Sequence, residues 1–410
     1  MPLRLPTSSP VFLIAAVCTA QVLAQLGAFT FFALLPTFFQ EWGLSHSQAG
    51  ILNGIIFGAY ALIVPFVVPL TDRIDPRRIY ICAVVLTTFS HLGMAFIADG
   101  FWDGFVFRAL AGIGWGGTYM VGLKALADLV EGPAQSRAVA FHAASIGLGG
   151  SLSFVLAGWA ADNVGWQSAF QLSAGGGFLA LLVMAFLVPR RTPVPLDDQG
   201  WLSTFIRALK NKSAIAYSLG YLVHTWEMFT LRSWVVTFLV FTAAQEGGPP
   251  NFLIPTVIAM LMELTGTASS VFGNEVAIRV GRRRWILMVM FASMAMGAIV
   301  GFSAGAGYGV AATICLIYNV LIYADSASLT AGAVGTAEPG RRGATLAVHG
   351  MLGYGGGFLG PLFLGVILDV LGGETVMNWG IAFAHVSVIM VIGPLAIKLL
   401  KPGELPGDKV

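Results

Sequence analysis

Charged side chains are scarce in this chain, and their scarcity excludes a soluble protein. Only 10% of the 410 residues are Asp, Glu, Lys or Arg, whereas a soluble domain carries about 25%. Hydrophobic residues make up 57% of the chain, and its mean hydropathy is +0.81. Apolar runs of about 20 residues, each long enough to cross a bilayer as a helix, recur throughout. The composition therefore predicts an all-α protein that crosses a membrane many times.

The chain also lacks the sequence signals of a disulfide framework and of common enzymes. Its three cysteines, Cys18, Cys82 and Cys315, all lie in apolar runs, and an odd, buried set argues against a disulfide framework. There is no Walker A string, no Cys/His spacing typical of a metal site and no G-x-S-x-G. The net charge is only +2. We therefore predict no enzyme activity, no cofactor, no metal site and no nucleic-acid partner.

A hydropathy reading divides the chain into twelve membrane spans. The N-terminus has Arg4 before an apolar run, as in a signal peptide, but the run continues through "LGAFTFFALLPTFF" and is interpreted as an uncleaved first span. The expected spans are 11–36, 48–70, 79–98, 104–128, 137–160, 166–188, 213–242, 252–275, 285–303, 309–332, 343–369 and 378–399.

Basic residues predict the orientation of these spans. If the N-terminus lies in the cytoplasm, the inner segments hold 19 of the 22 Lys and Arg residues and the outer loops hold none. This distribution follows the positive-inside rule, so we expect both termini in the cytoplasm. Three basic residues remain inside spans: Arg108, Lys124 and Arg232.

The second half of the chain repeats the first. "GGSLSFVLAGWAAD" (149–162) matches "GGFLGPLFLGVILD" (356–369) at an offset of 207, which places Asp162 on Asp369. Parallel six-helix repeats are a known transporter plan with the binding site at their interface. We predict an N-terminal bundle over 1–189, a cytoplasmic linker over 190–212 and a C-terminal bundle over 213–410.

The repeat and two short motifs resemble the major facilitator superfamily. The loop "DRIDPRR" (72–78) is similar to that family's G-x-x-x-D-R-x-G-R-R signature, although Val68 and Asp75 replace its glycines. "RALAGIG" contains the R-x-x-x-G pattern at Arg108 and Gly112, whereas the antiporter pattern G-x-x-x-G-P is missing from span 5. The resemblance implies a secondary transporter that rocks one half against the other. The residues expected to form its gating motif are Asp72, Arg73, Arg77 and Asp128.

Ionisable residues inside the spans indicate a candidate site. An ion at the bilayer centre costs about 2.5–3.5 kcal/mol on insertion scales, so such residues face protein or a water-filled path. The resemblance implies that spans 1, 4, 7 and 10 line that path. The residues predicted to bind substrate are Gln21, Gln25, Arg108, Trp115, Tyr119, Tyr221, Trp226, Arg232 and Tyr318. Those predicted to carry protons are His224, Glu227 and Asp325.

A structural interpretation of the same residues stays open. Glu227 and Arg232 can neutralise each other or their neighbours and pin the helices together. Lys124 lies one turn before Asp128 and is its natural ion-pair partner. The remaining ionisable residues, Glu263, His142 and His349, are expected to make helix-packing hydrogen bonds.

Three functions are compatible with this pattern. The buried cations favour a proton-coupled transporter of a small organic anion, since arginine binds carboxylates bidentately. The many aromatic residues, 12% of the chain, suit an efflux pump for amphipathic drugs or metabolites. A membrane receptor without transport is the third, but no extramembrane segment is long enough for a signalling domain. We expect a monomer in a bacterial inner membrane with a small-molecule substrate.

Overall fold

The computed structural model describes residues 9–130, 133–191, 201–250, 252–338, 341–403, 405 and 408. Within these ranges every regular element is a helix, so the predicted all-α class is confirmed. Residues 192–200 of the predicted linker lie outside the described residues, and α10 (Trp201–Lys210) follows them.

Ten helical stretches are long and apolar enough to cross a membrane within the described residues. Seven of them are single helices: α4 (His46–Leu70), α5 (Pro76–Phe96), α8 (Pro133–Asn163), α9 (Trp166–Leu187), α11 (Lys212–Ala244), α12 (Pro255–Val280) and α16 (Arg342–Val370). Three are composite: α13 (Arg282–Val300) with η1 (Gly301–Ala306), α14 (Tyr308–Tyr323) with α15 (Ser326–Gly335), and α17 (Val376–Met390) with α18 (Ile392–Leu400).

Predicted spans 1 and 4 are present but broken, and they complete the twelve. Span 1 consists of α1 (Pro10–Gln25), α2 (Thr30–Ala33) and α3 (Leu35–Glu41), and span 4 of α6 (Phe101–Gly116) and α7 (Tyr119–Leu129). The break in span 1 contains Gly27, where a Cβ would lie 2.1 Å from Nε2 of His91. The break in span 4 falls at Gly117 and Thr118. Span 10 is broken as well, at Ala324 and Asp325.

Local sequence explains where several helices begin. Ser45 forms a capping box with Gln48 at the start of α4. The Asp75 side chain accepts a hydrogen bond from the Arg77 amide at the start of α5. Proline opens α12 at Pro255, where the missing N–H costs nothing. Each of these helices begins directly after a loop that connects it to the preceding span.

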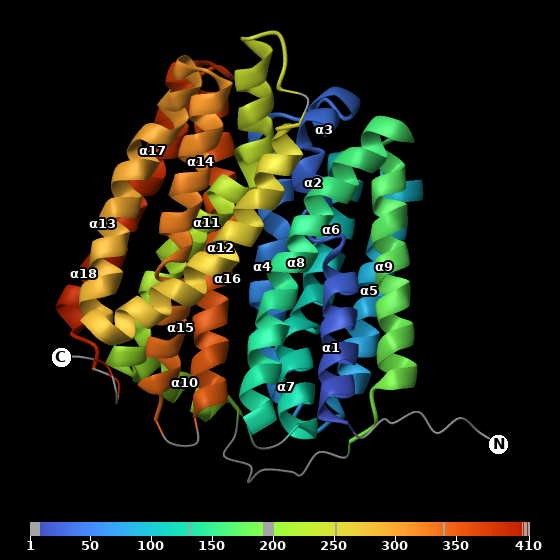
Figure 1. Cartoon of the computed structure of the whole chain (residues 1–410), viewed down its shortest axis with the longest axis vertical. Coiled ribbons are helices and arrows are strands. Elements are labelled where there is room, and N and C mark those ends of the chain that lie inside the picture. The colour runs from blue at the N-terminus through green and yellow to red at the C-terminus, as the bar shows by residue number, and fades with distance from the viewer. Residues whose placement is uncertain are drawn as a thin grey trace.

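The helices form two groups, and two pairs of helices make the most extensive contacts between them. Figure 1 shows α1–α9 on one side and α10–α18 on the other. In the first contact, Gly50, Gly54 and Gly58 form a stripe on α4 that faces Phe358, Pro361 and Leu362 of α16. A Cβ on Gly54 would lie 2.4 Å from the Phe358 carbonyl oxygen. Small residues at this spacing let two helix backbones approach closely.

The second contact joins α8 to α12. Gly147 lies against Thr267 and Gly158 against Thr256, and the Ser151 hydroxyl donates to the Met260 carbonyl oxygen over 3.4 Å. Because α8 and α16 contain the repeated glycine segments, the two contacts are equivalent positions of the internal repeat.

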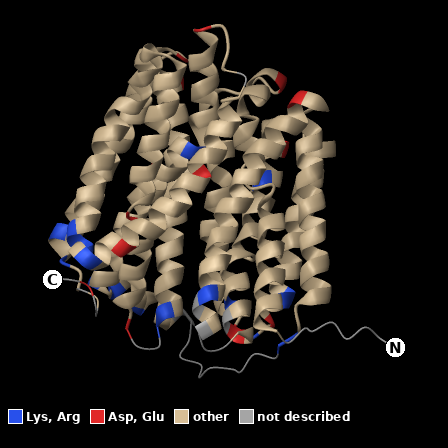
Figure 2. Ribbon diagram, in the orientation of Figure 1, with Lys and Arg blue, Asp and Glu red and all other residues tan. Residues whose placement is uncertain are grey.

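The two ends of the helical body differ in charge. Most Lys and Arg residues gather at the end where α1 begins and α18 ends (Figure 2). We call this end the basic face; it includes Arg73, Arg78, Arg279, Arg283 and Lys398. We call the other end, where α3 and α11 end at Glu41 and Ala244, the opposite face.

Candidate functional site

Arg232 forms a buried ion pair with Glu263 rather than with Glu227. Arg232 Nε lies 2.5 Å from Glu263 Oε1, and the two side chains are 8% and 4% exposed. The guanidinium also lies over the rings of Phe29, at 4.7 Å, and Tyr323, at 5.6 Å. Since Phe29 precedes α2 and Arg232 is on α11, the ion pair of the C-terminal group contacts the N-terminal group directly.

His224 pairs with Asp325 at the break of span 10. His224 Nδ1 lies 2.9 Å from Asp325 Oδ1, and both side chains are almost fully buried. The Tyr221 ring stacks on His349 at 4.1 Å and on His224 at 5.5 Å. The three predicted residues Tyr221, His224 and Asp325 therefore lie together, as a ring stack that ends at a carboxylate.

Glu227 lies in a different part of the same bundle. Ser293 of α13 donates a hydrogen bond to Glu227 Oε1 over 2.6 Å, and Tyr318 of α14 is a further neighbour. Both Glu227 and Tyr318 are 1% exposed. Within the described residues Glu227 has no basic partner, and the Ser293 hydroxyl is the hydrogen-bond donor to its carboxyl group.

Arg108 is the buried cation of the N-terminal group, and no described carboxylate pairs with it. Its guanidinium donates to the backbone carbonyl oxygens of Leu52 and Asn53 on α4. It also lies over the rings of Phe31, at 4.4 Å, and Phe32, at 5.2 Å. Arg108 is 4% exposed. Among the described residues, carbonyl oxygens and aromatic rings surround this guanidinium.

Two predicted residues face a small cavity in the same group of helices as Arg108. The cavity is lined by α1, α4, α5 and α6, and its walls include Gln25, His91 and Trp115. Gln25 Nε2 and Trp115 Nε1 are buried donors without a hydrogen bond among the described residues. Gln21 lies one turn before Gln25 on α1, and its side-chain oxygen accepts a hydrogen bond from the Tyr80 hydroxyl over 3.2 Å.

Aromatic side chains from both groups meet in the middle of the protein. We call this cluster the aromatic layer; it consists of Phe57, Tyr60, Trp115, Phe229 and Tyr354. The Phe57 and Phe229 rings stack at 3.7 Å, and Tyr60 and Tyr354 lie 3.9 Å apart. Trp115 contacts Phe57, Tyr60 and Tyr354. These contacts close the space between α4, α6, α11 and α16.

Two predicted substrate residues, Trp226 and Tyr119, have ring contacts with other helices. Trp226 Nε1 donates to His385 Nε2 over 3.0 Å, and its ring packs on Phe363, so it joins α11 to α16 and α17. The Tyr119 ring stacks on His142 at 5.5 Å. Both rings take part in helix packing, and their role in binding substrate stays a prediction.

Two residues of the predicted gating motif, Arg77 and Asp128, make side-chain contacts within the N-terminal group. Arg77 donates to the carbonyl oxygens of Met184 and Ala185 at the end of α9, and Lys124 pairs with Asp128 at 2.7 Å, as its spacing predicts. Asp72 lies in the turn after α4 and has no ion pair among the described residues. Arg73 is exposed in the same turn.

Several residues of the site could not be assigned from the sequence. Glu263 was expected only to make packing hydrogen bonds, but it is the partner of Arg232. The aromatic layer includes Phe57, Tyr60 and Tyr354 from spans 2 and 11, outside the four helices expected to line the path. The spacing of the glycines at 50, 54 and 58 could have predicted part of this arrangement, because these glycines mark the face of α4 that meets α16.

The fold and the buried polar groups define a class of protein. Two related helical bundles, interrupted spans and a buried ion pair at the break of span 10 fit the architecture of secondary membrane transporters. A model of the Major Facilitator Superfamily matches residues 17–361. The chain belongs to this superfamily, and its predicted family and its predicted lack of enzyme activity are confirmed.

The curated relatives are proteins of greater length. Protein spinster homolog 1 of Homo sapiens is 23% identical over 287 residues, 66% of this chain and 54% of that protein. Protein spinster homolog 3 of Danio rerio is 26% identical over 243 residues, 57% of this chain and 49% of that protein. The chain thus spans about half the length of these relatives. A probable 4-methylmuconolactone transporter of Cupriavidus pinatubonensis is 27% identical over 163 residues, 38% of this chain and 36% of that protein.

Solved structures agree on the fold. A bacterial homolog of the human lysosomal transporter Spinster, in an inward-facing and occupied conformation, has a TM-score of 0.74 at 15% identity, covering 95% of this chain and 96% of that chain. A point mutant of the nucleoside transporter NupG has a TM-score of 0.72 at 12% identity, covering 95% of this chain and 99% of that chain. At these identities the likeness shows the shared fold alone.

Proposed function

We propose that this protein moves a small organic anion together with protons by alternating access. The observation that carries the proposal is Arg108, a buried guanidinium without a described carboxylate partner. Such a group favours an anion that supplies the missing counter-charge. The donors Gln25 Nε2 and Trp115 Nε1, which line a cavity in the same group of helices, also lack acceptors among the described residues. A carboxylate, which only accepts hydrogen bonds, matches this set of donors.

The proton pathway in this proposal lies in the C-terminal group. Glu227 and Asp325 are buried carboxyl groups, and His224 is a side chain of suitable chemistry to relay protons to Asp325. Because the N-terminal cation and the C-terminal acids are on different groups of helices, substrate and proton can each favour a different packing of the two groups.

The proposed placement in the membrane follows from the charge of the basic face. We assign this face to the cytoplasm of a bacterial inner membrane, with both termini on that side. The two rocking units are residues 1–189 and 213–410, joined by 190–212, and the working unit is a monomer. The four gating residues predicted from the sequence, Asp72, Arg73, Arg77 and Asp128, lie on this cytoplasmic side.

Proton flux into liposomes tests the proposal. Purified protein is placed in liposomes that hold a pH-sensitive dye, and pools of carboxylates, inorganic anions or lipophilic cations are added outside. We expect the carboxylate pool to cause a pH change inside the liposomes. Arg108→Gln should abolish this change, whereas the exposed control Arg78→Gln should retain it. Glu227→Gln should keep substrate exchange but lose the pH change, while Glu41→Gln at the opposite face should behave as wild type.

The aromatic layer supports a second candidate, the efflux of amphipathic drugs or metabolites. Rings from Phe57, Tyr60, Trp115, Phe229 and Tyr354 offer stacking surfaces in the middle of the protein. A dye response to lipophilic cations alone, unaffected by Arg108→Gln, would favour this function over anion transport.

A further inference from the structure

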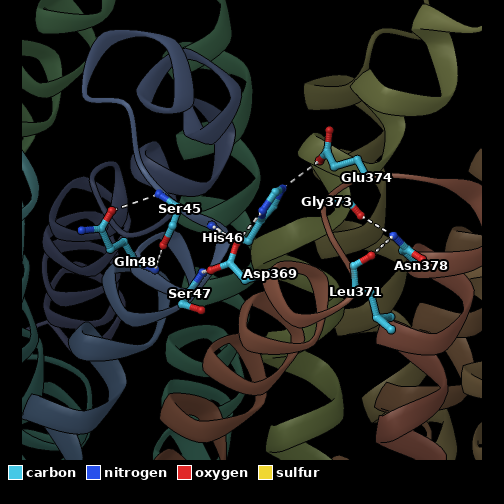
Figure 3. A network of polar contacts seen from close by, with 9 residues as sticks. All are labelled: Ser45, His46, Ser47, Gln48, Asp369, Leu371, Gly373, Glu374 and Asn378. Carbon is cyan, nitrogen blue, oxygen red and sulfur yellow. Dashed lines mark hydrogen bonds and ion pairs between the residues drawn. The ribbon is translucent and has the colours of Figure 1, made fainter.

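The opposite face carries a polar network that ties the two groups of helices together. Figure 3 shows Asp369, near the end of α16, against the first residues of α4. Asp369 Oδ1 accepts from the His46 amide over 3.0 Å, and Oδ2 accepts from the Ser47 amide over 2.7 Å. His46 Nδ1 also lies 2.9 Å from Oδ1. One carboxylate of the C-terminal group thus holds the first turn of a helix from the N-terminal group.

The amides at the start of α4 show what this carboxylate contributes. The first turn of a helix leaves amide groups without partners inside the helix. Ser45 and Gln48 satisfy each other's amides, at 2.9 and 3.2 Å, in the capping box. The two amides between them, of His46 and Ser47, are satisfied by Asp369 alone. Separation of α16 from α4 therefore exposes two amide donors and the positive end of a helix dipole.

The surrounding chain holds Asp369 in this position. A Cβ on Gly365, one turn earlier in α16, would lie 2.1 Å from the His46 carbonyl oxygen, so the two backbones are in direct contact. After α16, Asn378 donates to the carbonyl oxygens of Leu371 and Gly373, over 3.0 and 2.8 Å, and fixes the loop (Figure 3). Glu374 of this loop lies 4.0 Å from His46 Nε2.

The internal repeat offers a comparison at the other contact between the groups. Asp162 of α8 is the repeat equivalent of Asp369, at an offset of 207, but its side chain is exposed. The corresponding helix α12 begins with Pro255, which has no amide hydrogen, and Ile254 provides no side-chain cap. The opposite face is therefore held by a charged helix cap at only one of its two equivalent contacts.

We propose that Asp369, capping α4 through the His46 and Ser47 amides, is a one-sided latch that keeps the opposite face closed. Breaking this cap is then the step that opens the transporter on that face. Asp369 is a positioning residue: it controls which side of the substrate path is open without contacting the substrate. This inference rests on the alternating-access part of the proposed function and is independent of the substrate.

Distances between spin labels on each face test the latch. In a variant whose three cysteines are replaced by serine, labels at Glu41→Cys and Gln245→Cys report the opposite face. Labels at Arg78→Cys and Arg279→Cys report the basic face. All four positions are exposed. Asp369→Asn keeps the shape of the side chain but removes its charge, and Asp162→Asn is the matched control.

Asp369→Asn should increase the ratio of open to closed opposite face about tenfold, as expected for a lost anion at a helix start. The basic-face distance should shorten in parallel. His46→Ala keeps both amide donors and should change the ratio less than about threefold. Gly365→Ala pushes α16 away from His46 without changing the carboxylate, and it should shift the ratio in the same direction as Asp369→Asn. It replaces Asp369→Asn in the test if Asp369→Asn does not fold.

The outcomes separate the latch from alternating access itself. The proposed latch is wrong if the wild-type protein alternates between open and closed faces but Asp369→Asn leaves both distances unchanged. It is also wrong if Asp162→Asn changes the distances as much as Asp369→Asn does. An effect of His46→Ala as large as that of Asp369→Asn would also overturn the capping role. If wild type shows one fixed distance on each face at every pH and with every substrate pool, alternating access is contradicted instead.

Discussion

Removing one partner of the Arg232–Glu263 pair should destabilise the protein strongly, while removing both should not. The two side chains are only 8% and 4% exposed, and their atoms approach to 2.5 Å, so water cannot replace the missing partner. Breaking a buried pair costs about 3–5 kcal/mol, whereas replacing both partners by apolar residues is often neutral or stabilising. Arg232→Met should thus lower the free energy of unfolding by roughly that amount. The double variant Arg232→Met with Glu263→Met should recover most of it.

The assay is thermal unfolding in detergent, followed by intrinsic fluorescence, for wild type, both single variants and the double variant. Arg341→Ala is the control, because its partner Glu338 is 50% exposed and such a surface pair contributes only about 0–1 kcal/mol. Transport by the double variant is measured in the dye-loaded liposomes. A stable double variant without transport would assign Arg232 a role in binding beyond its structural one.

Two results would refute this reasoning. An Arg232→Met protein that unfolds at the wild-type temperature would mean that Glu263 finds another partner or becomes neutral at no cost. A double variant as unstable as the single variants would show that the rings around the guanidinium, Phe29 and Tyr323, carry the stability instead of the charge pair.

Three further variants test the packing of the helices and one hydrogen bond between them. Gly112→Ala should destabilise the N-terminal group by about 1–3 kcal/mol, since its Cβ would lie 2.2 Å from the Ile56 carbonyl oxygen. Gly175→Ala in α9, with open space around it, should be neutral or stabilise by up to about 1 kcal/mol; thermal unfolding of both variants checks the contrast, and equal effects would contradict it. Trp226→Phe should lose about 1 kcal/mol of stability with the His385 hydrogen bond and retain transport, so a variant that is stable but inactive would return Trp226 to the substrate path.

The sequence predicts the fold well because membrane insertion depends on quantities that are local in the chain. Span length and hydropathy are read from consecutive residues, and the repeat of 149–162 at 356–369 shows that the chain has two related halves. The Lys124–Asp128 pair is confirmed for the same reason, since a spacing of four within one helix fixes the contact. The helix breaks were harder to predict, because Gly27 and Thr118 are compatible with a continuous apolar helix.

The partners of the ionisable residues could not be predicted, because they depend on how separate helices rotate and pack. Arg232 has Glu227 on its own helix, but its partner is Glu263 on the next one. The indole of Trp226 donates a hydrogen bond to His385, 159 residues away in the chain. Sequence distance carries no information about such contacts.

The sequence by itself determined an all-helical membrane protein of this superfamily and the residues that carry charge inside it. Only the tertiary structure decided which of these charges have an oppositely charged partner among the described residues. Arg108 and Arg232 look alike in the chain, yet carbonyl oxygens surround one and a carboxylate neutralises the other. Asp162 and Asp369 are equivalent in the repeat, yet only Asp369 caps a helix of the other group. The physical reason is that the energy of a buried charge depends on its neighbours in space, which packing alone supplies.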